Sequence, residues 1–341
     1  MGELIGQSLV SSINKPAIEL TLTLGPQIDI VVDDQLPCDS SGRLLFMHSE
    51  DRSEFWSALL EKAYAKLHGS YEALKGGTTC EAMVDFTGGV TELYDIQGGP
   101  ENLLKLMSKA WERNSFMGCS IEADPRVTEA ETSQGLIRGH AYSITDIKTI
   151  EIESPTVSGV IPMLRVRNPW GNEGEWRGAW SDGSPEWRFV HDETKEDIGL
   201  TFDADGEFWM SSKDFMTHFQ RVEICNLSPD SLEEDYGSSD KKKWEMSLYE
   251  GAWVSGQTAG GCRNFLDTFA SNPQYTISLV DPDEDDDDNK CTVIVGLIQK
   301  NRRAQRAQGV ECLTIGFAIY KLDGGEPGGG QGRCDLSRGA A

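Results

Sequence analysis

Apolar and polar residues follow a regular pattern from residue 28 onward, beginning with a strand and then a helix. Ile28 to Val32 is predicted to be a β-strand that stops at an acidic, proline-containing turn. The apolar residues that follow fall on one helical face, with Ser53 as the expected N-cap and Gly69 as the stop. The apolar positions of this helix are Phe55, Trp56, Leu59, Leu60, Ala63, Tyr64 and Leu67. Residues 1–27 have no comparable period and are interpreted as a divergent leader.

The pattern then gives a second helix and turns from helical to extended. Pro100 marks the first turn of this helix, whose apolar positions are Leu103, Leu104, Met107, Ala110 and Trp111. Strands are expected at 116–121, 139–144, 163–168 and 222–227. A loop rich in Trp, Gly, Asp and Ser is expected at 171–187. Ser211 to Asp214 resembles a capping box that opens a short helix through Phe219.

The last third of the chain is predicted to be a separate unit. Residues 229–243 are acidic and serine-rich, which favours a linker between a first domain at 28–228 and a second at 244–322. Strands are expected in the second domain at 275–280, 291–297 and 312–320, followed by a glycine-rich tail at 323–341. A complete sandwich needs about seven strands, so the second domain is expected to be a partial one.

Composition narrows the class of partner and the compartment. The 341 residues carry a formal charge of −25, which argues against nucleic acid, because phosphate binding requires clustered Lys and Arg. The eight cysteines are scattered without a C-x-x-C pair, so neither a zinc knuckle nor a redox motif is predicted. The sequence has no recognisable secretory signal and no run long enough to span a membrane, which favours reduced thiols and a cytoplasmic location.

Two short motifs carry chemistry. His140 lies at the start of one expected strand, and Asn168 lies at the end of the next. If these strands form a hairpin, the Asn168 amide can reach His140 and fix its tautomer, while Trp170 shields that bond from water. Alone, a Gly-His pair is more often a turn or a core histidine, and Asn-Pro-Trp-Gly is more often a plain turn. In this order, a strand apart, the two indicate half of a thiol-protease site.

These motifs resemble the histidine and asparagine segments of calpains, the cytosolic calcium-dependent cysteine proteases. The resemblance rests on Gly139-His140-Ala141-Tyr142-Ser143 and Arg167-Asn168-Pro169-Trp170-Gly171. It extends to the segments 32–37, 54–66, 85–89, 205–210 and 258–264, and so covers about 28–320. The resemblance implies an α+β fold, in which the second half of a papain-like cysteine protease core is followed by a partial antiparallel β-sandwich. It also implies that His140 is the general base and Asn168 the orienting residue.

The nucleophile is the missing part of this pattern. In this protease class it lies roughly 130–150 residues before the histidine, which is near or before residue 1. Nothing matches the calpain Gly-Asp-Cys-Trp segment, and Cys38, which follows Pro37 with no helix start to activate it, is interpreted as an incidental loop thiol. Loss of a nucleophile costs about 10⁶ in turnover, so the chain is expected to be catalytically inert in this form. The ends look replaced, as in a splice form or a partial gene model.

The resemblance also implies calcium as the cofactor. Matched to the calpain pattern, Glu175, Asp182, Asp205 and Glu207 fall on calcium ligands, and Asp203 supplies a backbone carbonyl. Solvated surface carboxylates are the alternative interpretation of either acidic cluster alone. No EF-hand pattern occurs in the sequence.

Three interpretations of the function stay open at this point. The first is a calcium-dependent cysteine endopeptidase that cleaves intracellular proteins. The second is a non-catalytic, calcium-responsive regulator that binds other proteins, and the third is a fragment with no stable function. The expected partners are therefore protein substrates or regulatory proteins. Weak phospholipid contact through the sandwich is also expected, although the acidic run at 283–288 is more simply a solvated loop.

Overall fold

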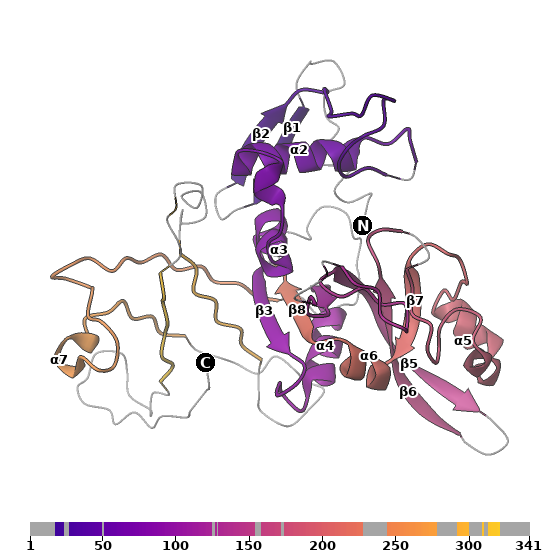
Figure 1. Cartoon of the computed structure of the whole chain (residues 1–341). Helices are drawn as coiled ribbons and strands as arrows, with labels where there is room; N and C mark the ends of the chain where they lie inside the picture. The colour runs from indigo at the N-terminus through magenta and orange to yellow at the C-terminus, as the bar shows by residue number, and fades with distance from the viewer. Residues whose placement is uncertain are drawn as a thin grey trace.

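The computed structural model describes residues 18–23, 27–49, 51–124, 127, 129–153, 158–171, 174–227, 244–277, 292–299, 309 and 313–320. It contains a two-stranded sheet and a six-stranded sheet with the order β3-β8-β4-β5-β6-β7. Neighbouring strands are antiparallel in both sheets. Helices lie beside these sheets, which gives the expected α+β class (Figure 1).

The first lobe consists of the small sheet and the helix packed on it. Strand β1 (Ile18–Thr23) pairs with β2 (Gln27–Val32), and helix α2 (Trp56–His68) packs against β2. Ile30, Val32, Leu60 and Ala63 form the buried core of this lobe. Strand β1 lies inside the segment for which no element was expected, because its apolar pattern is too short to be recognised without its partner strand.

One prediction about α2 was wrong. The helix begins after Phe55, which has no side-chain cap, whereas Ser53 donates its hydroxyl to Asp51 two residues earlier. The Ser53 hydroxyl is therefore used in a tight turn and not on the helix amides. The predicted end is correct, since Gly69 adopts a left-handed φ of 102°.

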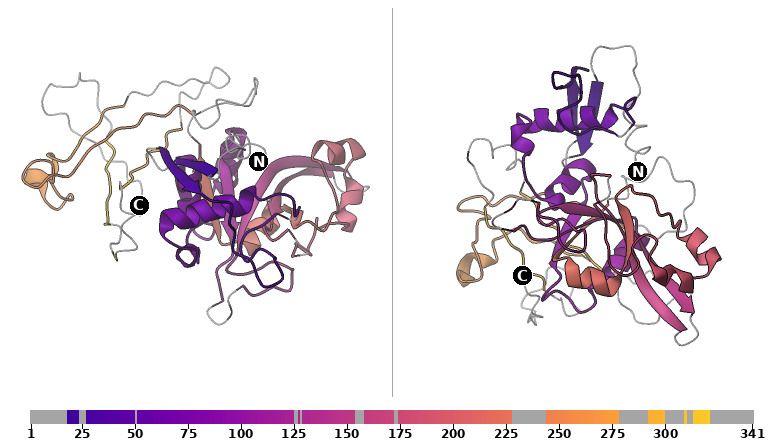
Figure 2. Two further views of the ribbon diagram at one scale, coloured as in Figure 1. Left: turned by 90° about the horizontal axis from the view of Figure 1, so that it is seen from above. Right: turned by 45° about the vertical axis from the view of Figure 1, so that its right-hand side comes forward.

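Helix α3 (Thr79–Thr87), which the sequence pattern did not reveal, lies between the small lobe and the large sheet (Figures 1 and 2). It follows the short 3₁₀ helix η1 (Glu72–Leu74) and contacts the edge strand β3 (Val90–Asp95) and β8 (Arg221–Asn226). Its buried face is short and partly polar, which hides the apolar period.

The large sheet is covered by two further helices. Helix α4 (Leu103–Glu112) starts three residues after Pro100, and α6 (Ser212–His218) starts at the predicted capping box, where Ser211 accepts a hydrogen bond from the Asp214 amide at 3.1 Å. Both helices contribute to one core with the sheet, through Leu103, Met107, Phe215 and Phe219. Burial of these side chains, at about 25 cal/mol per Å² of apolar area, holds the layers together.

A long hairpin extends the sheet on the side away from β3. Strand β4 (Phe116–Ser120) pairs with β5 (Ala141–Glu153), which pairs with β6 (Ser158–Arg167), and β6 pairs with β7 (Glu207–Ser211). The predicted loop at 171–187 ends in a 3₁₀ helix, η2 (Pro185–Phe189), and is followed by α5 (Asp192–Asp197). Trp180, Trp187 and Trp209 form a second buried core against the hairpin. Figure 2 shows the far end of the hairpin projecting from the rest of the sheet.

The second domain has little regular structure within the described residues. Its one described helix is α7 (Leu266–Phe269), and the described parts of the expected strands carry no strand pairing. Val293, Val295 and Phe317 are exposed there, in extended segments without strand pairing among the described residues. The linker at 229–243, the acidic run at 283–288 and the tail at 323–341 lie outside the described residues. Within the described residues, no helix is long and apolar enough to cross a membrane.

Candidate active site

The β5–β6 hairpin brings the two motif residues together. His140 immediately precedes β5 and Asn168 immediately follows β6, and Ser143 pairs with Arg167 at that end of the hairpin. In an antiparallel hairpin, the residue just before the first strand and the residue just after the second strand lie side by side at the open end. The His140 Nε2 atom lies 2.9 Å from the Asn168 Oδ1 atom. Antiparallel pairing thus creates a contact between residues that are 28 positions apart.

The orientation of the Asn168 amide is fixed by its other partners. Its Nδ2 donates to the Gly174 carbonyl at 3.0 Å, and its Oδ1 accepts from the Trp170 amide at 3.1 Å. Flipping the amide would set donor against donor at Trp170 and acceptor against acceptor at Gly174. Asn168 is fully buried, so such a mismatch would not be repaired by water. Since Oδ1 faces His140, the Nε2 atom of the ring carries the proton and Nδ1 is the nitrogen left for chemistry.

Aromatic rings enclose the imidazole. The Trp170 ring lies 4.6 Å from the His140 ring, and the Tyr142 ring meets it edge-on at 5.2 Å. Tyr142 accepts a hydrogen bond from the Ile137 amide, and burial raises the pKa of its hydroxyl to about 12. His140 is 9% exposed, whereas Trp170 is 47% exposed and forms the outer wall. The His140–Asn168 bond is therefore held in a dry, apolar surrounding.

Sequence reasoning missed one carboxylate at this site. Glu129 Oε1 lies 3.2 Å from His140 Nδ1, and the two residues are 11 positions apart. Glu129 sits in an irregular loop with a left-handed φ of 56°. No motif points to it, because its position depends on how the loop returns to the start of β5.

Of the five predicted calcium ligands, four lie in one acidic cluster, and the fifth, Glu207, is bonded to other residues. Burial, followed by the nearby carboxylates of Glu175, Asp205 and Asp203, raises the pKa of Asp182 to about 7. These four acidic residues therefore form one electrostatic cluster. Glu207 instead accepts a hydrogen bond from the Thr145 hydroxyl at 2.7 Å and pairs with Arg165, so its carboxylate is committed elsewhere.

Backbone hydrogen bonds stiffen the clustered segments. Glu175 accepts from the Gly206 amide at 2.8 Å, and Asp205 accepts from the Glu207 amide at 2.9 Å. Among the described residues, no group of three or more His, Cys, Asp or Glu side chains is arranged to hold a metal ion. The carboxylates are thus close enough to repel one another but do not converge on one point. Their hard oxygen atoms are nevertheless the donors that calcium prefers.

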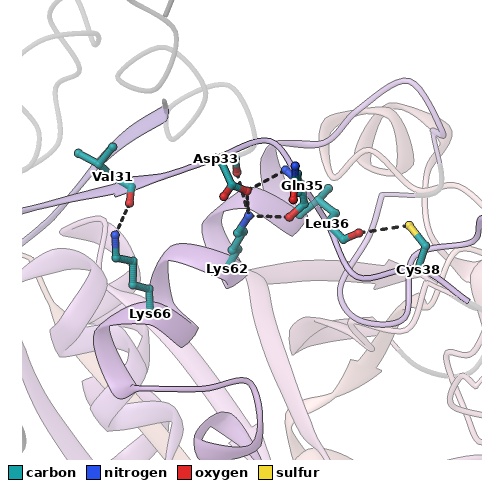
Figure 3. A network of polar contacts seen from close by, with 7 residues as sticks. All are labelled: Val31, Asp33, Gln35, Leu36, Cys38, Lys62 and Lys66. Carbon is teal, nitrogen blue, oxygen red and sulfur yellow. Dashed lines mark hydrogen bonds and ion pairs between the residues drawn. The ribbon is translucent and has the colours of Figure 1, made fainter. Parts of the chain in front are cut away.

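Within the described residues, no thiol bonds to a ring nitrogen of His140. Both His140 ring nitrogens are used by Glu129 and Asn168, while Cys38 is exposed in the loop after β2 and donates to the Leu36 carbonyl at 3.4 Å (Figure 3). The same loop is tied to α2 by Lys62, which reaches Asp33 and the Gln35 carbonyl (Figure 3). Burial raises the pKa of the Cys80 thiol to about 11, and burial also holds the pKa of the Cys119 thiol well above its usual value.

The antiparallel sheet with its covering helices, and the histidine–asparagine pair at the open end of the hairpin, are those of the second half of a papain-like cysteine protease. The model of the calpain family cysteine protease matches residues 20–226, and the model of calpain large subunit domain III matches residues 249–334. The chain belongs to the calpain family of cysteine proteases.

Curated relatives agree with this family. Calpain-A of Drosophila melanogaster is 68% identical over 299 residues, which is 88% of this chain and 36% of the relative. Calpain-B of the same species is 67% identical over 298 residues, or 87% of this chain and 32% of the relative. Human Calpain-9 is 51% identical over 295 residues, or 86% of this chain and 41% of the relative. The chain thus spans about a third of the length of the first two relatives.

Proposed function

We propose that this chain supplies the base-and-orienter half of a calcium-dependent cysteine endopeptidase that acts on intracellular proteins. In this proposal the chain cleaves peptide bonds only together with a cysteine-bearing half and is inert by itself. The observation that supports it most directly is the buried Asn168 amide on His140 Nε2, with Nδ1 as the nitrogen free to exchange partners. A histidine held in one tautomer by an uncharged orienter is what a thiol nucleophile requires.

The chemistry assigned to His140 is two proton transfers. Nδ1 takes the proton of the cysteine thiol, and the thiolate attacks the carbonyl carbon of the peptide bond. When the carbon–nitrogen bond breaks, the imidazolium returns that proton to the leaving amine. A water molecule, deprotonated by the same nitrogen, then splits the thioester and regenerates the thiol. Asn168 holds the imidazole ring in one orientation through these steps, and Trp170 shields the His140–Asn168 hydrogen bond from water.

Calcium is assigned to the acidic cluster. When bound, the ion would neutralise repelling carboxylates and fix the loops next to Asn168. Glu175, Asp182 and Asp205 would offer side-chain oxygen atoms and Asp203 a backbone carbonyl, whereas the Glu207 side chain stays with Arg165. The loop from Gly174 to Gly206 touches Asn168 directly at its two ends, through the Gly174 carbonyl and the Gly206 carbonyl. Fixing the acidic cluster would therefore also fix the two carbonyl groups that hold Asn168 in place.

A second candidate function is a non-catalytic, calcium-responsive protein that binds other calpain-type chains or their substrates. The contact of Glu129 with His140 Nδ1 favours it, because the nitrogen that would activate a thiol is engaged by a carboxylate. The same chain can serve both roles if the carboxylate is displaced when a cysteine-bearing half binds.

One experiment separates these candidates. The purified, reduced chain is assayed for calcium-stimulated casein hydrolysis alone and after mixing with a separately produced cysteine-bearing half of a calpain core. We expect no hydrolysis by the chain alone, and hydrolysis in the mixture that His140→Ala abolishes and Cys38→Ala leaves unchanged. Hydrolysis by the chain alone that is lost in Cys38→Ala would instead make Cys38 the nucleophile. An inactive mixture, with calcium binding still seen by calorimetry, would favour the binding function.

A further inference from the structure

The contact between Glu129 and His140 has no assigned role in the chemistry above. We propose that Glu129 is an internal counter-ion that competes with the nucleophilic thiolate for Nδ1 of His140 and so acts as a positioning residue for the imidazolium ring. The proposal rests on the function proposed above and adds a regulatory contact to the same site. It predicts that the carboxylate holds the ring charged and oriented, and leaves when the thiolate takes its place.

A hydrogen bond between Glu129 and His140 requires either a doubly protonated His140 ring or a protonated Glu129. Asn168 Oδ1 accepts, so Nε2 must donate, and a neutral ring then has only a lone pair at Nδ1. An ionised carboxylate also offers only acceptors. Glu129 Oε1 at 3.2 Å from Nδ1 therefore makes a bond only if one of the two partners gains a proton. The proposal places this proton on the ring, which makes an imidazolium–carboxylate pair.

The loop that carries Glu129 is built against the histidine segment. The Arg138 amide donates to the Ala130 carbonyl at 2.8 Å, and the Gly139 amide donates to the Ile121 carbonyl at 2.8 Å. Glu131 and Ile137 form a β-bridge in the same loop. These bonds flank Glu129 on one side and His140 on the other. They keep the carboxylate beside the ring even though its backbone is in the left-handed region, which is unfavourable for residues other than glycine.

The other titratable groups near the ring are neutral or paired elsewhere. Tyr142 faces the ring edge-on and stays neutral, because burial raises its pKa to about 12. The buried Cys119, whose pKa is also raised, stays a thiol. Glu131, the other nearby carboxylate, pairs with Arg177 at 3.1 Å. Asn168 and Trp170, on the far side of the ring, carry no charge. Within the described residues, Glu129 is therefore the anion that contacts His140.

The exposure of Glu129 suits a temporary partner. Its side chain is 40% exposed, whereas the His140 side chain is 8% exposed. A half-exposed carboxylate regains water when it swings away, and partly exposed ion pairs contribute little to stability. When the carboxylate leaves, the Nδ1 proton is lost to solvent, and Nδ1 then takes the proton of the incoming thiol. The ring is thus an imidazolium before and after the exchange, and the thiolate replaces the carboxylate as its counter-ion.

The first test is a pH titration of the His140 ring by nuclear magnetic resonance in the full chain, with ring-nitrogen labels and assignment through His140→Ala. We expect the His140 ring of the Glu129→Gln variant to lose its second proton at a pH about one unit lower than in the natural chain. This is a tenfold change in the proton equilibrium. Glu131→Gln is the matched control and should titrate like the natural chain. Glu129→Asp, with a shorter carboxylate, should fall between them. Equal titration of the natural chain and Glu129→Gln, both folded by circular dichroism, would overturn the proposal.

The second test uses the mixture with a cysteine-bearing half. Glu129→Gln should bind that half more tightly or reach half-maximal hydrolysis at a severalfold lower concentration of it, because no carboxylate competes for Nδ1. An unchanged or raised half-maximal concentration would overturn the competition. The two proposals fail separately: a mixture without hydrolysis in every variant rejects the proposed function, while the ring titration still decides whether Glu129 is the counter-ion.

Discussion

Asn168 follows β6 and His140 precedes β5, and the 2.9 Å bond between them joins the two ends of one hairpin. The asparagine is fully buried and uses its amide three times, toward His140, Gly174 and Trp170. A side chain that meets three partners at once has one allowed orientation. The hairpin therefore fixes both the position of the base and its tautomer.

Removing the orienting amide should separate catalysis from folding. We expect Asn168→Ala to reduce kcat of the mixture with a cysteine-bearing half by about 10²–10⁴ with little change in KM, because a misoriented or wrong tautomer of His140 cannot accept the thiol proton. The substitution also leaves the groups that bonded to the Asn168 side chain without that partner in a buried place. This should lower the unfolding free energy by about 1–3 kcal/mol. Steady-state kinetics and urea denaturation measure the two effects.

Asn226 provides the matched control for that substitution. It is also a buried asparagine of the same sheet, bonded to Ser115 and Glu92, but it has no contact with the active site among the bonds described for it. Asn226→Ala should lose stability by a similar amount and keep kcat. A loss of kcat as large as that of Asn168→Ala would show that general loosening of the sheet, not ring orientation, limits turnover.

Calcium binding should depend on some members of the acidic cluster more than on others. Asp182→Asn and Glu175→Gln should weaken calcium binding by about tenfold or more, because each removes a charged oxygen donor from the cluster. Glu207→Gln should have a clearly smaller effect, since the Glu207 carboxylate pairs with Arg165 and Thr145. Isothermal titration calorimetry of the reduced chain measures all three. Equal losses would mean that Glu207 turns into the cluster when the ion binds.

The thiols should differ in reactivity according to their burial. At pH 8 the thiolate fraction of Cys80, whose pKa is raised to about 11, is about 10⁻³. Cys119 and Cys225 also have raised pKa values and are buried. We expect iodoacetamide to modify the exposed Cys38 and Cys262 first, and the partly buried Cys80 and the buried Cys119 and Cys225 at least about a hundredfold more slowly. Raising the pH to 9.5 should speed Cys80 about thirtyfold.

Peptide mapping by mass spectrometry measures each site, and the urea-unfolded chain is the control in which all the thiols should react at similar rates. Rapid modification of Cys80 in the native chain at pH 8 would mean that α3 opens readily from the sheet.

Two serines predicted as helix caps allow a direct comparison. Ser211 accepts the Asp214 amide at the start of α6, so Ser211→Ala should cost about 1 kcal/mol of unfolding free energy. Ser53 makes no such bond to α2 and donates to Asp51 in an exposed turn, so Ser53→Ala should change stability by less than about 0.5 kcal/mol. Urea denaturation of both variants measures the difference. Similar losses would mean that Ser53 caps α2 in solution.

Much of the local structure could be predicted because its cause lies within a few residues. The apolar face of α2, the stop at Gly69, the cap at Ser211 and the strands β4 and β8 all follow from period and turn chemistry. The chain order of His140 and Asn168, each at a strand end, was enough to predict that they meet. Family resemblance supplied their roles.

Other features depend on partners that are distant in sequence. Strand β1 and helix α3 have weak patterns of their own and exist through pairing with β2 and packing on β3 and β8. In the second domain, the strand-like pattern at 313–320 carries no strand pairing within the described residues. A strand is a property of a pair, so the pattern of one segment cannot decide it.

The sequence by itself determined the chemistry that this protein can offer: one imidazole, one orienting amide and a set of carboxylates, in an order typical of calpains. Only the tertiary structure decided how they are used. It turned Glu207 toward Arg165 and away from the acidic cluster, and it brought Glu129 to the nitrogen of His140 that a thiolate would need. The reason is physical, because side-chain contacts across loops depend on where the backbone returns, and a hydrogen bond is made or lost within less than an ångström.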